Sequence, residues 1–174
     1  INCPTLSQEL LASELFGHTR GAFTGAVRDQ PGRVEVAEGG TLFLDEVSEI
    51  APELQAKLLR FLQEKEFERV GENQTRRADV RVVAATNRDL EQAVKEGRFR
   101  EDLLFRLNVV EVKIPALRER PEDILPLARH FLQFFARSAK RPLLELSKET
   151  EAVLLKYQWP GNIRELRNAM ERAT

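Results

Sequence analysis

Two adjacent carboxylates close the segment GGTLFLDE at residues 39–46. The apolar run at 41–44 is typical of a short buried strand, so Asp45 and Glu46 stand where that strand ends. In open α/β sheets, ligands bind at the carboxyl ends of the strands. Because hard divalent cations prefer oxygen ligands, Asp45 could hold a metal ion while Glu46 polarises an attacking water. For an isolated pair of this kind, two solvated charges at a strand end are the commoner explanation.

The run VRVVAATN at residues 80–87 predicts a second buried strand that ends in a polar amide. Asn87 could orient the same water from the end of a neighbouring strand. The alternative is a turn-forming asparagine, because asparagine is common where strands end.

Arg100 and Arg106 flank the sequence EDLLF and lie six residues apart. On one helix they point in different directions, so they would not clamp a single group. Each could instead reach a phosphate bound to a neighbouring subunit and stabilise charge in a transition state. The alternative is that both are surface arginines on a charged helix. Arg164, near the start of the last predicted helix, is open to the same two interpretations.

Residues 21–26 read GAFTGA, so Phe23 stands alone among small residues. It has no apolar neighbours in the sequence to pack against. The segment is therefore either a buried turn that holds an aromatic side chain or an exposed tip that contacts another molecule.

The composition excludes several classes of protein. The 174 residues are 42% hydrophobic and 32% charged with a net charge of −1, so the chain has no basic footprint for direct DNA binding. Cys3 is the only cysteine, which excludes an intramolecular disulfide and a cysteine-based zinc site and favours a cytoplasmic location. No apolar run approaches the roughly 18 residues of a membrane helix. The chain also lacks the nucleophile motif G-x-S-x-G and the phosphate cradle G-x-x-x-x-G-K-S/T.

The elements that must position the candidate residues follow from hydrophobic periodicity. Strands are expected at 33–37, 41–44, 80–87 and 109–114, with an edge strand or loop at 67–71, and helices at 7–16, 52–62, 89–96 and roughly 99–106. Beyond Pro121 every periodic segment is helical. The sequence therefore predicts an α/β sheet layer at 1–117 and a small helical subdomain at 118–174. Because the chain begins INCPTL without an initiator methionine, we expect a fragment of a longer protein.

Six segments occur in order along the whole chain: ELFGHTRGAFTGA, GGTLFLDE, ATNRDL, FREDLLFRLNVV, LRERPEDI and WPGNIRELRN. Together they resemble the AAA+ ATPase domain of bacterial sigma-54-dependent transcription activators, also called enhancer-binding proteins. GAFTGA is nearly diagnostic of that family. The resemblance implies an α/β fold with the parallel sheet layer of a AAA+ P-loop NTPase, incomplete at its amino end because the chain starts after the Walker A motif. A small all-helical lid follows.

The resemblance also implies ATP and Mg²⁺ as cofactors. Asp45 and Glu46 look like the Walker B pair, in which the first residue serves the magnesium and the second activates water. Asn2 matches the asparagine that pairs with that glutamate and links the nucleotide state to the loop. Asn87 is similar to the sensor I residue.

The same resemblance implies roles for three arginines. Arg100 and Arg106 look like the two arginine fingers that reach the ATP of the neighbouring subunit. Arg164, in the sequence GNIREL, resembles sensor II, through which the helical lid responds to the nucleotide.

In that family GAFTGA is the tip of a mobile loop that contacts the sigma-54 subunit of RNA polymerase, and a second loop near residues 69–71 assists it. Phe23 and Thr24 would be the exposed contact. The whole hexapeptide is Gly21, Ala22, Phe23, Thr24, Gly25 and Ala26. The implied activity is ATP-dependent remodelling of sigma-54 polymerase closed complexes by a hexameric ring, which activates transcription. The alternative is a sigma-54-binding module without hydrolysis, or an inactive fragment, because Walker A is absent.

Overall fold

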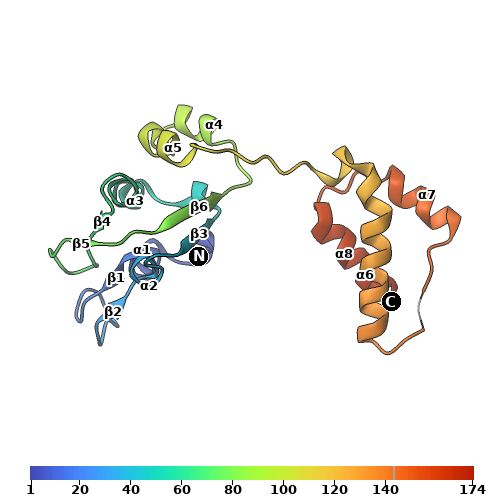
Figure 1. Ribbon diagram of the computed structural model, residues 1–174, viewed down its shortest axis with the longest axis horizontal. Coiled ribbons are helices and arrows are strands. Elements are labelled where there is room, and N and C mark those ends of the chain that lie inside the picture. Colours follow the sequence, from blue (N-terminus) through green and yellow to red (C-terminus); the bar gives the residue numbers. More distant parts are fainter. Residues whose placement is uncertain (143) are drawn as a thin grey trace. The chain divides into compact units, whose positions relative to one another are not determined.

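The computed structural model describes residues 1–142 and 144–174 and divides the chain into two compact units, Ile1–Glu111 and Val112–Thr174 (Figure 1). The first unit combines strands with helices, and the described part of the second contains helices only. The predicted α/β fold with a parallel sheet and a helical carboxy-terminal part is confirmed. No helix in the described ranges is long and apolar enough to cross a membrane.

The central sheet of the first unit pairs two strands in parallel. Strand β3 (Thr41–Asp45) lies beside β6 (Arg81–Ala85), with Asp45 opposite Ala85. On the other edge of β3, the backbone N–H of Asp45 donates to the carbonyl oxygen of Ile1 at 2.8 Å. Both predicted strands are therefore present, and they end at the same edge of the sheet.

One face of the sheet carries the core of the first unit. Leu42 and Leu44 are buried, whereas Phe43, which points to the opposite face, is 49% exposed. The helices α1 (Gln8–Phe16) and α3 (Pro52–Glu64) contribute to the same core through their buried apolar residues, which are Leu11, Leu15, Phe16, Leu54, Leu58, Leu59 and Phe61. The remaining elements of this unit are η1 (Cys3–Thr5), β1 (Gly17–His18), β2 (Gln30–Pro31), α2 (Arg33–Val36), η2 (Val47–Glu49), β4 (Glu66–Phe67), β5 (Arg76–Arg77), α4 (Leu90–Lys95) and α5 (Glu101–Leu107).

The strand predicted at 33–37 is wrong, because α2 occupies this segment. A strand would place Val34 and Val36 on one face, but Val34 is buried and Val36 is 67% exposed. Residues two apart on a helix point in nearly opposite directions, which accounts for this difference. The segment starts at Gly32, where an added Cβ would lie 2.3 Å from the backbone nitrogen of Gly17. The two backbones therefore lie in direct contact where α2 begins.

The strand predicted at 109–114 is also wrong, because the segment has no regular structure. Its four apolar side chains, Val109, Val110, Val112 and Ile114, are between 76% and 80% exposed. Periodicity identifies residues that suit a strand, but a strand also needs a partner for its backbone groups. Among the described strands, none pairs with this segment, and the division between the two units falls within it.

The second unit is built on helices α6 (Ile124–Ser138), α7 (Lys148–Lys156) and α8 (Asn162–Ala173), preceded by the short turns η3 (Leu117–Glu119) and η4 (Pro121–Asp123). Its hydrophobic core contains Leu117, Ile124, Ala128, Leu132, Leu154, Trp159, Leu166 and Met170. The indole N–H of Trp159 donates to the carbonyl oxygen of Leu154 at 2.9 Å. This bond satisfies the polar atom of a buried aromatic side chain.

Candidate functional site

Two turns meet at the carboxyl ends of the parallel strands. Residues 46–50 follow β3 and residues 86–88 follow β6, and we call them the strand-end turns. Glu46 begins the first turn in the left-handed region, with φ 57° and ψ 52°. A non-glycine residue in a sparsely populated conformation costs roughly 1–3 kcal/mol and persists only where its surroundings fix it. Such residues gather at functional sites.

The contact that fixes Glu46 comes from the neighbouring turn. The backbone N–H of Asn87 donates to Oε2 of Glu46 at 3.1 Å. A carboxylate that accepts a backbone hydrogen bond is oriented without a second charged group. The two candidate residues are thus brought together, although the bond uses the backbone of Asn87 and not its side-chain amide.

Two further contacts join the same turns. The Thr86 hydroxyl donates to Oγ of Ser48 at 3.0 Å, and a guanidinium nitrogen of Arg88 lies 2.8 Å from Oε1 of Glu49. Ser48 is buried, so its hydroxyl needs this partner. The relative position of the two turns is therefore set by three links between segments about 40 residues apart.

Asp45 and Glu46 supply two adjacent carboxylates that could serve a magnesium ion. Asp45 is the last residue of β3, and Glu46 follows it directly. Within the described residues, no group of three or more His, Cys, Asp or Glu side chains could hold a metal ion. Mg²⁺ needs no such group, because it retains waters and binds through one or two carboxylates together with substrate phosphates.

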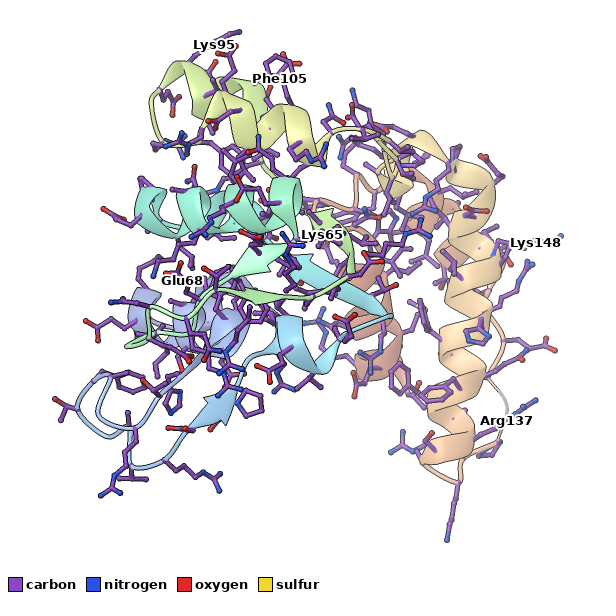
Figure 2. The ribbon with its side chains drawn as sticks, turned by 60° about the vertical axis from the view of Figure 1, so that its left-hand side comes forward. Lys65, Glu68, Lys95, Phe105, Arg137 and Lys148 are labelled. Atoms are coloured by element: carbon purple, nitrogen blue, oxygen red, sulfur yellow. The ribbon has the colours of Figure 1, made fainter. Side chains whose placement is uncertain are left out.

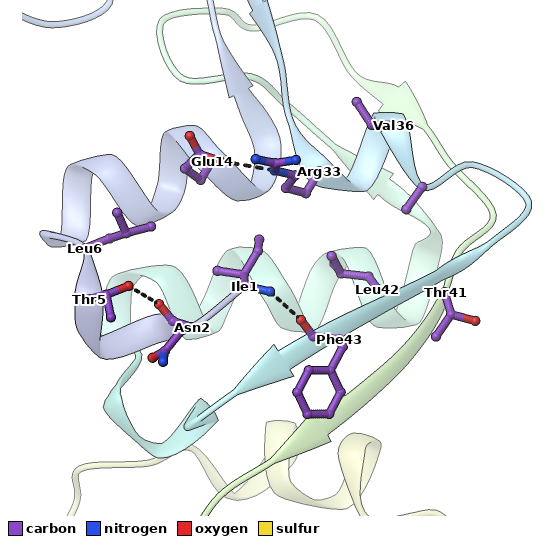
Figure 3. Close-up of a pocket in the computed structure, with 11 residues that line it drawn as sticks. Ile1, Asn2, Thr5, Leu6, Glu14, Arg33, Val36, Thr41, Leu42 and Phe43 are labelled. Atoms are coloured by element: carbon purple, nitrogen blue, oxygen red, sulfur yellow. Dashed lines mark hydrogen bonds and ion pairs between the residues drawn. The ribbon is translucent and has the colours of Figure 1, made fainter. Parts of the chain in front are cut away.

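Asn2 lies beside the strand end, but its side chain does not bond to Glu46. Its backbone forms a parallel bridge with Asp45, and its carbonyl oxygen accepts from the Thr5 hydroxyl at 2.8 Å. A groove of about 590 Å³ begins here and follows the edge of β3 (Figure 3). Neither Asp45 nor Glu46 lines this groove. The coupling role of Asn2 stays a prediction.

The two candidate arginines of the first unit are both bonded within their own chain. Arg100 is the N-cap residue of α5, and its guanidinium contacts the Asp102 carboxylate at 2.7 and 3.0 Å. This ion pair raises the pKa of Arg100 and lowers the pKa of Asp102. Arg106, in the last turn of α5, donates to the carbonyl oxygen of Leu62 at 3.0 Å. Both side chains are exposed, so either could exchange its partner for a phosphate.

Arg164 belongs to the second unit, where it is exposed near the start of α8. Its predicted role as sensor II stays a prediction.

The GAFTGA loop, residues 19–29, is held mainly by its own backbone. Gly21 donates to the carbonyl oxygen of Ala26 at 2.8 Å, and Ala26 donates to that of Phe23 at 3.0 Å. Thr24 is exposed, as expected, but Phe23 is only half-exposed. Its ring packs edge-to-face against His18 with 5.0 Å between the ring centroids. The expectation that Phe23 is an exposed contact is therefore corrected, because its ring is partly buried.

The hairpin of β4 and β5, residues 66–77, supports the base of this loop. The Val70 carbonyl oxygen accepts from the backbone N–H of Thr19 at 3.0 Å. Gly71 has φ 84°, and an added Cβ there would lie 2.6 Å from Cβ of Ala22. The segment near 69–71, predicted to assist the GAFTGA loop, lies directly against it.

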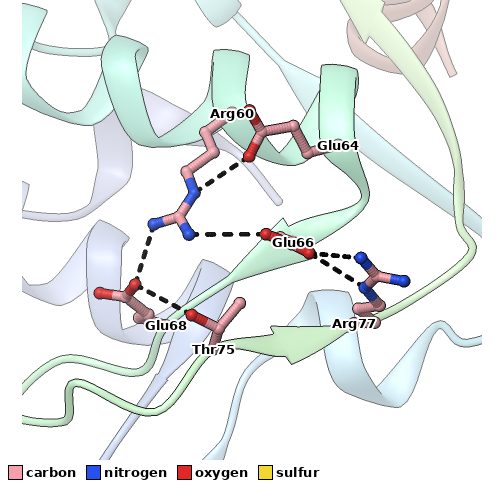
Figure 4. A network of polar contacts seen from close by, with 6 residues as sticks. All are labelled: Arg60, Glu64, Glu66, Glu68, Thr75 and Arg77. Carbon is pink, nitrogen blue, oxygen red and sulfur yellow. Dashed lines mark hydrogen bonds and ion pairs between the residues drawn. The ribbon is translucent and has the colours of Figure 1, made fainter.

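At the stem of the hairpin, Arg60 contacts the carboxylates of Glu64, Glu66 and Glu68, and Arg77 contacts Glu66 (Figure 4).

Comparison with known proteins identifies the family. Residues 1–113 match the family described as the Sigma-54 interaction domain, and residues 118–174 match the AAA+ ATPase lid domain. The chain belongs to the sigma-54 interaction domain family. The sequence resemblance to AAA+ domains of sigma-54-dependent activators is thereby confirmed.

Several relatives of this sigma-54 interaction domain are transcription regulators. It is 62% identical over its full length to the alginate biosynthesis regulator AlgB of Pseudomonas syringae, of which it covers 39%. It is 58% identical over 99% of its length to the Nif-specific regulatory protein of Azotobacter vinelandii, of which it covers 33%. Among solved structures, NtrX from Brucella abortus in complex with ADP matches with a TM-score of 0.90 and 41% identity, over 99% of this chain and 37% of that one. The chain thus spans well under half the length of these relatives.

Sequence reasoning missed several residues that hold the sigma-54 interaction domain's site together. His18 is one of them, because it is buried, its Nδ1 shares a hydrogen bond with Oγ of Ser13 at 2.7 Å, and its ring packs against that of Phe23. Ser48 and the fully buried Gln55 carried no signal in the sequence, because a polar residue at a helical or turn position is ordinarily solvated.

Proposed function

We propose that this chain is the ATPase part of a sigma-54-dependent transcription activator. It hydrolyses ATP with Mg²⁺ and uses the GAFTGA loop to remodel closed complexes of the sigma-54 polymerase. The proposal rests on Glu46, which stands at the strand ends in a strained conformation with its carboxylate oriented by Asn87. The solved NtrX chains that resemble this one hold ADP and ATP, which supports a nucleotide ligand.

The residues divide the chemistry between them. Asp45 would hold magnesium, largely through water, and the ion when bound supplies positive charge beside the phosphates. Glu46 uses Oε2 to accept from Asn87, which leaves Oε1 to take a proton from the attacking water. Asn87 keeps that carboxylate in place from the next strand. Arg164 of the lid would contact the nucleotide from the second unit.

The arginines at α5 act on a neighbouring subunit in this proposal. Arg100 and Arg106 have exposed side chains and would stabilise negative charge on the phosphates bound to the neighbouring subunit. Such an arrangement requires a closed ring of subunits, which we take to be a hexamer. The assembly would act in the cytoplasm, where its partner is the sigma-54 subunit, and the chain itself would make no direct contact with DNA.

A test of hydrolysis uses Glu46→Gln in the full-length natural protein. The amide oxygen still accepts from Asn87, but the base is lost, so we expect phosphate release to fall by about 10³-fold. Nucleotide binding, measured by fluorescence titration, should persist. The matched control is Glu53→Gln, which neutralises an exposed carboxylate in the first turn of α3 and should leave hydrolysis unchanged. Normal turnover by Glu46→Gln would remove the role assigned to this residue.

A second candidate function is binding to sigma-54 without hydrolysis. The observation in its favour is that the GAFTGA loop is closed mainly by its own backbone bonds, so that it could contact sigma-54 without nucleotide turnover. The same experiment separates the two functions. Hydrolysis by the unmodified protein supports the ATPase, whereas sigma-54 binding with no phosphate release supports the binding module.

A further inference from the structure

Gln55 is a polar side chain placed in the core of the first unit. It lies on α3 and is 0% exposed, among the largest fully buried side chains of the described chain. Burying a primary amide without hydrogen bonds is costly, so its partners account for its presence. An apolar side chain of similar size would fill the same volume without that requirement.

The amide makes three short hydrogen bonds to backbone groups. Nε2 donates to the carbonyl oxygens of Ile50 at 2.7 Å and Arg98 at 3.0 Å, and Oε1 accepts from the backbone N–H of Arg100 at 2.9 Å. Backbone carbonyls only accept and the N–H only donates, so these partners fix the orientation of the amide. Both donor hydrogens and the acceptor oxygen of Gln55 are satisfied.

These bonds connect two places that matter to the proposed chemistry. Ile50 ends the strand-end turn that Glu46 begins. Arg100 is the N-cap residue of α5, the helix that also carries Arg106. Helices α3 and α5 lie side by side in the first unit (Figure 1). A single side chain on α3 therefore touches both the turn after Glu46 and the start of the arginine-bearing helix.

The other end of α5 is attached to the same helix. Arg106 donates to the Leu62 carbonyl oxygen near the end of α3, while Gln55 holds the N-terminus. Leu103 lies between these attachments and Phe99 just before the first, and both are buried. Apolar packing sets the distance between two helices but tolerates sliding, whereas directional hydrogen bonds fix the register.

We propose that Gln55 is a positioning residue that fixes the start of α5 against the turn that follows Glu46. Through this register it sets where Arg100 and Arg106 lie when they meet a neighbouring subunit. The inference rests on the proposed function, since it concerns how arginines in one subunit serve the nucleotide of the next.

The first measurement compares steady-state hydrolysis by Gln55→Met with the unmodified protein, both at full natural length. Methionine keeps the volume but leaves the backbone groups of Ile50, Arg98 and Arg100 without this partner. A small displacement of catalytic groups costs about 100-fold in rate, so we expect kcat to fall by that factor. The KM for ATP should stay within about twofold, because the nucleotide is held by the subunit whose own site is intact.

The decisive measurement mixes two variants in one ring. Glu46→Gln subunits lack the base but present intact arginines, whereas Gln55→Met subunits keep the base but misplace their arginines. The active site of a Gln55→Met subunit has its own base, and it receives intact arginines when the neighbour that supplies them is a Glu46→Gln subunit. In an equal random mixture we expect activity to recover to about a quarter of the unmodified rate, since one neighbouring pair in four has the productive order. Arg106→Ala mixed with Glu46→Gln provides the benchmark for such recovery.

Failure to recover would overturn the proposal, because Gln55 would then act on its own site or on the fold alone. This outcome differs from failure of the proposed function, in which Glu46→Gln itself would hydrolyse ATP normally. If Gln55→Met does not fold, Gln55→Asn replaces it, since the shorter amide stays neutral and keeps its donors and acceptor but cannot reach Ile50, Arg98 and Arg100 together. The same mixing outcomes apply to that variant.

Lys65→Met is the matched structural control. Lys65 follows the last turn of α3 (Figure 2), and its ammonium donates to the carbonyl oxygen of Val80 at 2.9 Å. This variant also removes a hydrogen bond from the α3 region to a distant backbone carbonyl, but at the end away from Arg100. We expect its hydrolysis rate to remain within about twofold of the unmodified protein. An equal loss of activity in Lys65→Met would show that Gln55 has only a general structural role.

Discussion

The strand-end turns and the GAFTGA loop are held in different ways. The turns follow paired strands and are joined by contacts between Glu46 and Asn87 and between Ser48 and Thr86, which are about 40 residues apart in sequence. The loop is closed mostly by bonds within residues 19–29, and Phe23 rests on a single ring. Geometry built on rigid elements is maintained, whereas a loop with local bonds can rearrange at little cost. The difference separates a place suited to chemistry from one suited to a moving contact.

The largest expected effect is that one substitution in the loop reduces promoter opening but leaves ATP hydrolysis unchanged. Thr24→Ala removes an exposed hydroxyl from the loop without touching the strand-end turns. We expect hydrolysis within about twofold of the unmodified protein, but at least tenfold less open-complex formation, because few residues dominate an interface. Phosphate release and promoter opening are measured on the same preparation. Unchanged promoter opening would exclude Thr24 from the contact, and lost hydrolysis would mean that the two regions are not separate.

A second expected effect compares how much each region contributes to the free energy of unfolding. Leu44 is fully buried beneath the strand-end turn, and Leu44→Ala should lower the free energy of unfolding by about 3 kcal/mol through lost burial and a cavity. Val27 in the GAFTGA loop is 78% exposed, and Val27→Ala should change it by less than about 0.5 kcal/mol. Urea titration followed by circular dichroism measures both. Comparable losses from the two substitutions would show that the loop belongs to the cooperative core.

The smallest effect concerns the hairpin that supports the loop. The Arg77 guanidinium holds the pKa of Glu66 below its ordinary value of 4.5. Stabilisation from this pair is present above that value and is lost as the pH falls through the lower pKa of the folded state. Arg77→Gln should therefore slightly lower the urea midpoint at neutral pH and have no effect once Glu66 is protonated in acid. High salt should also weaken the difference at neutral pH, because the Arg77 side chain faces solvent.

A difference that persists in acid would contradict the assignment of the effect to this pair. It would mean that Arg77 supports the hairpin through packing. The hairpin's support of the GAFTGA loop would then not depend on the charge of Glu66.

Local sequence signals predicted much of the framework. Helix α3 follows from the helical spacing of Leu54, Leu58 and Phe61, and β6 follows from its β-branched run. The same reasoning failed at 33–37 and 109–114, where suitable residues were present but the local geometry or the partner strand differed. Val36 illustrates the limit, since alternation over five residues does not distinguish a strand from one helical turn.

The candidate site was predicted only as a set of residues. Placing Asp45 and Asn87 at neighbouring strand ends was possible, because parallel strands end at a common edge. The bond from the Asn87 backbone to Glu46, the ring of His18 beneath Phe23 and the amide of Gln55 were not predictable from single positions. Each depends on the separation of two segments to within a hydrogen-bond or van der Waals distance.

The sequence by itself determined the family, through ordered motifs, and the main helices and parallel strands, through the spacing of apolar residues. Only the tertiary structure determined that Glu46 adopts a left-handed conformation, that Phe23 is half-buried, and that Gln55 joins the turn after Glu46 to the start of α5. The physical reason is that periodicity reports which face of an element prefers to be buried. Directional bonds between distant segments depend on their register, which is established only when those segments pack together.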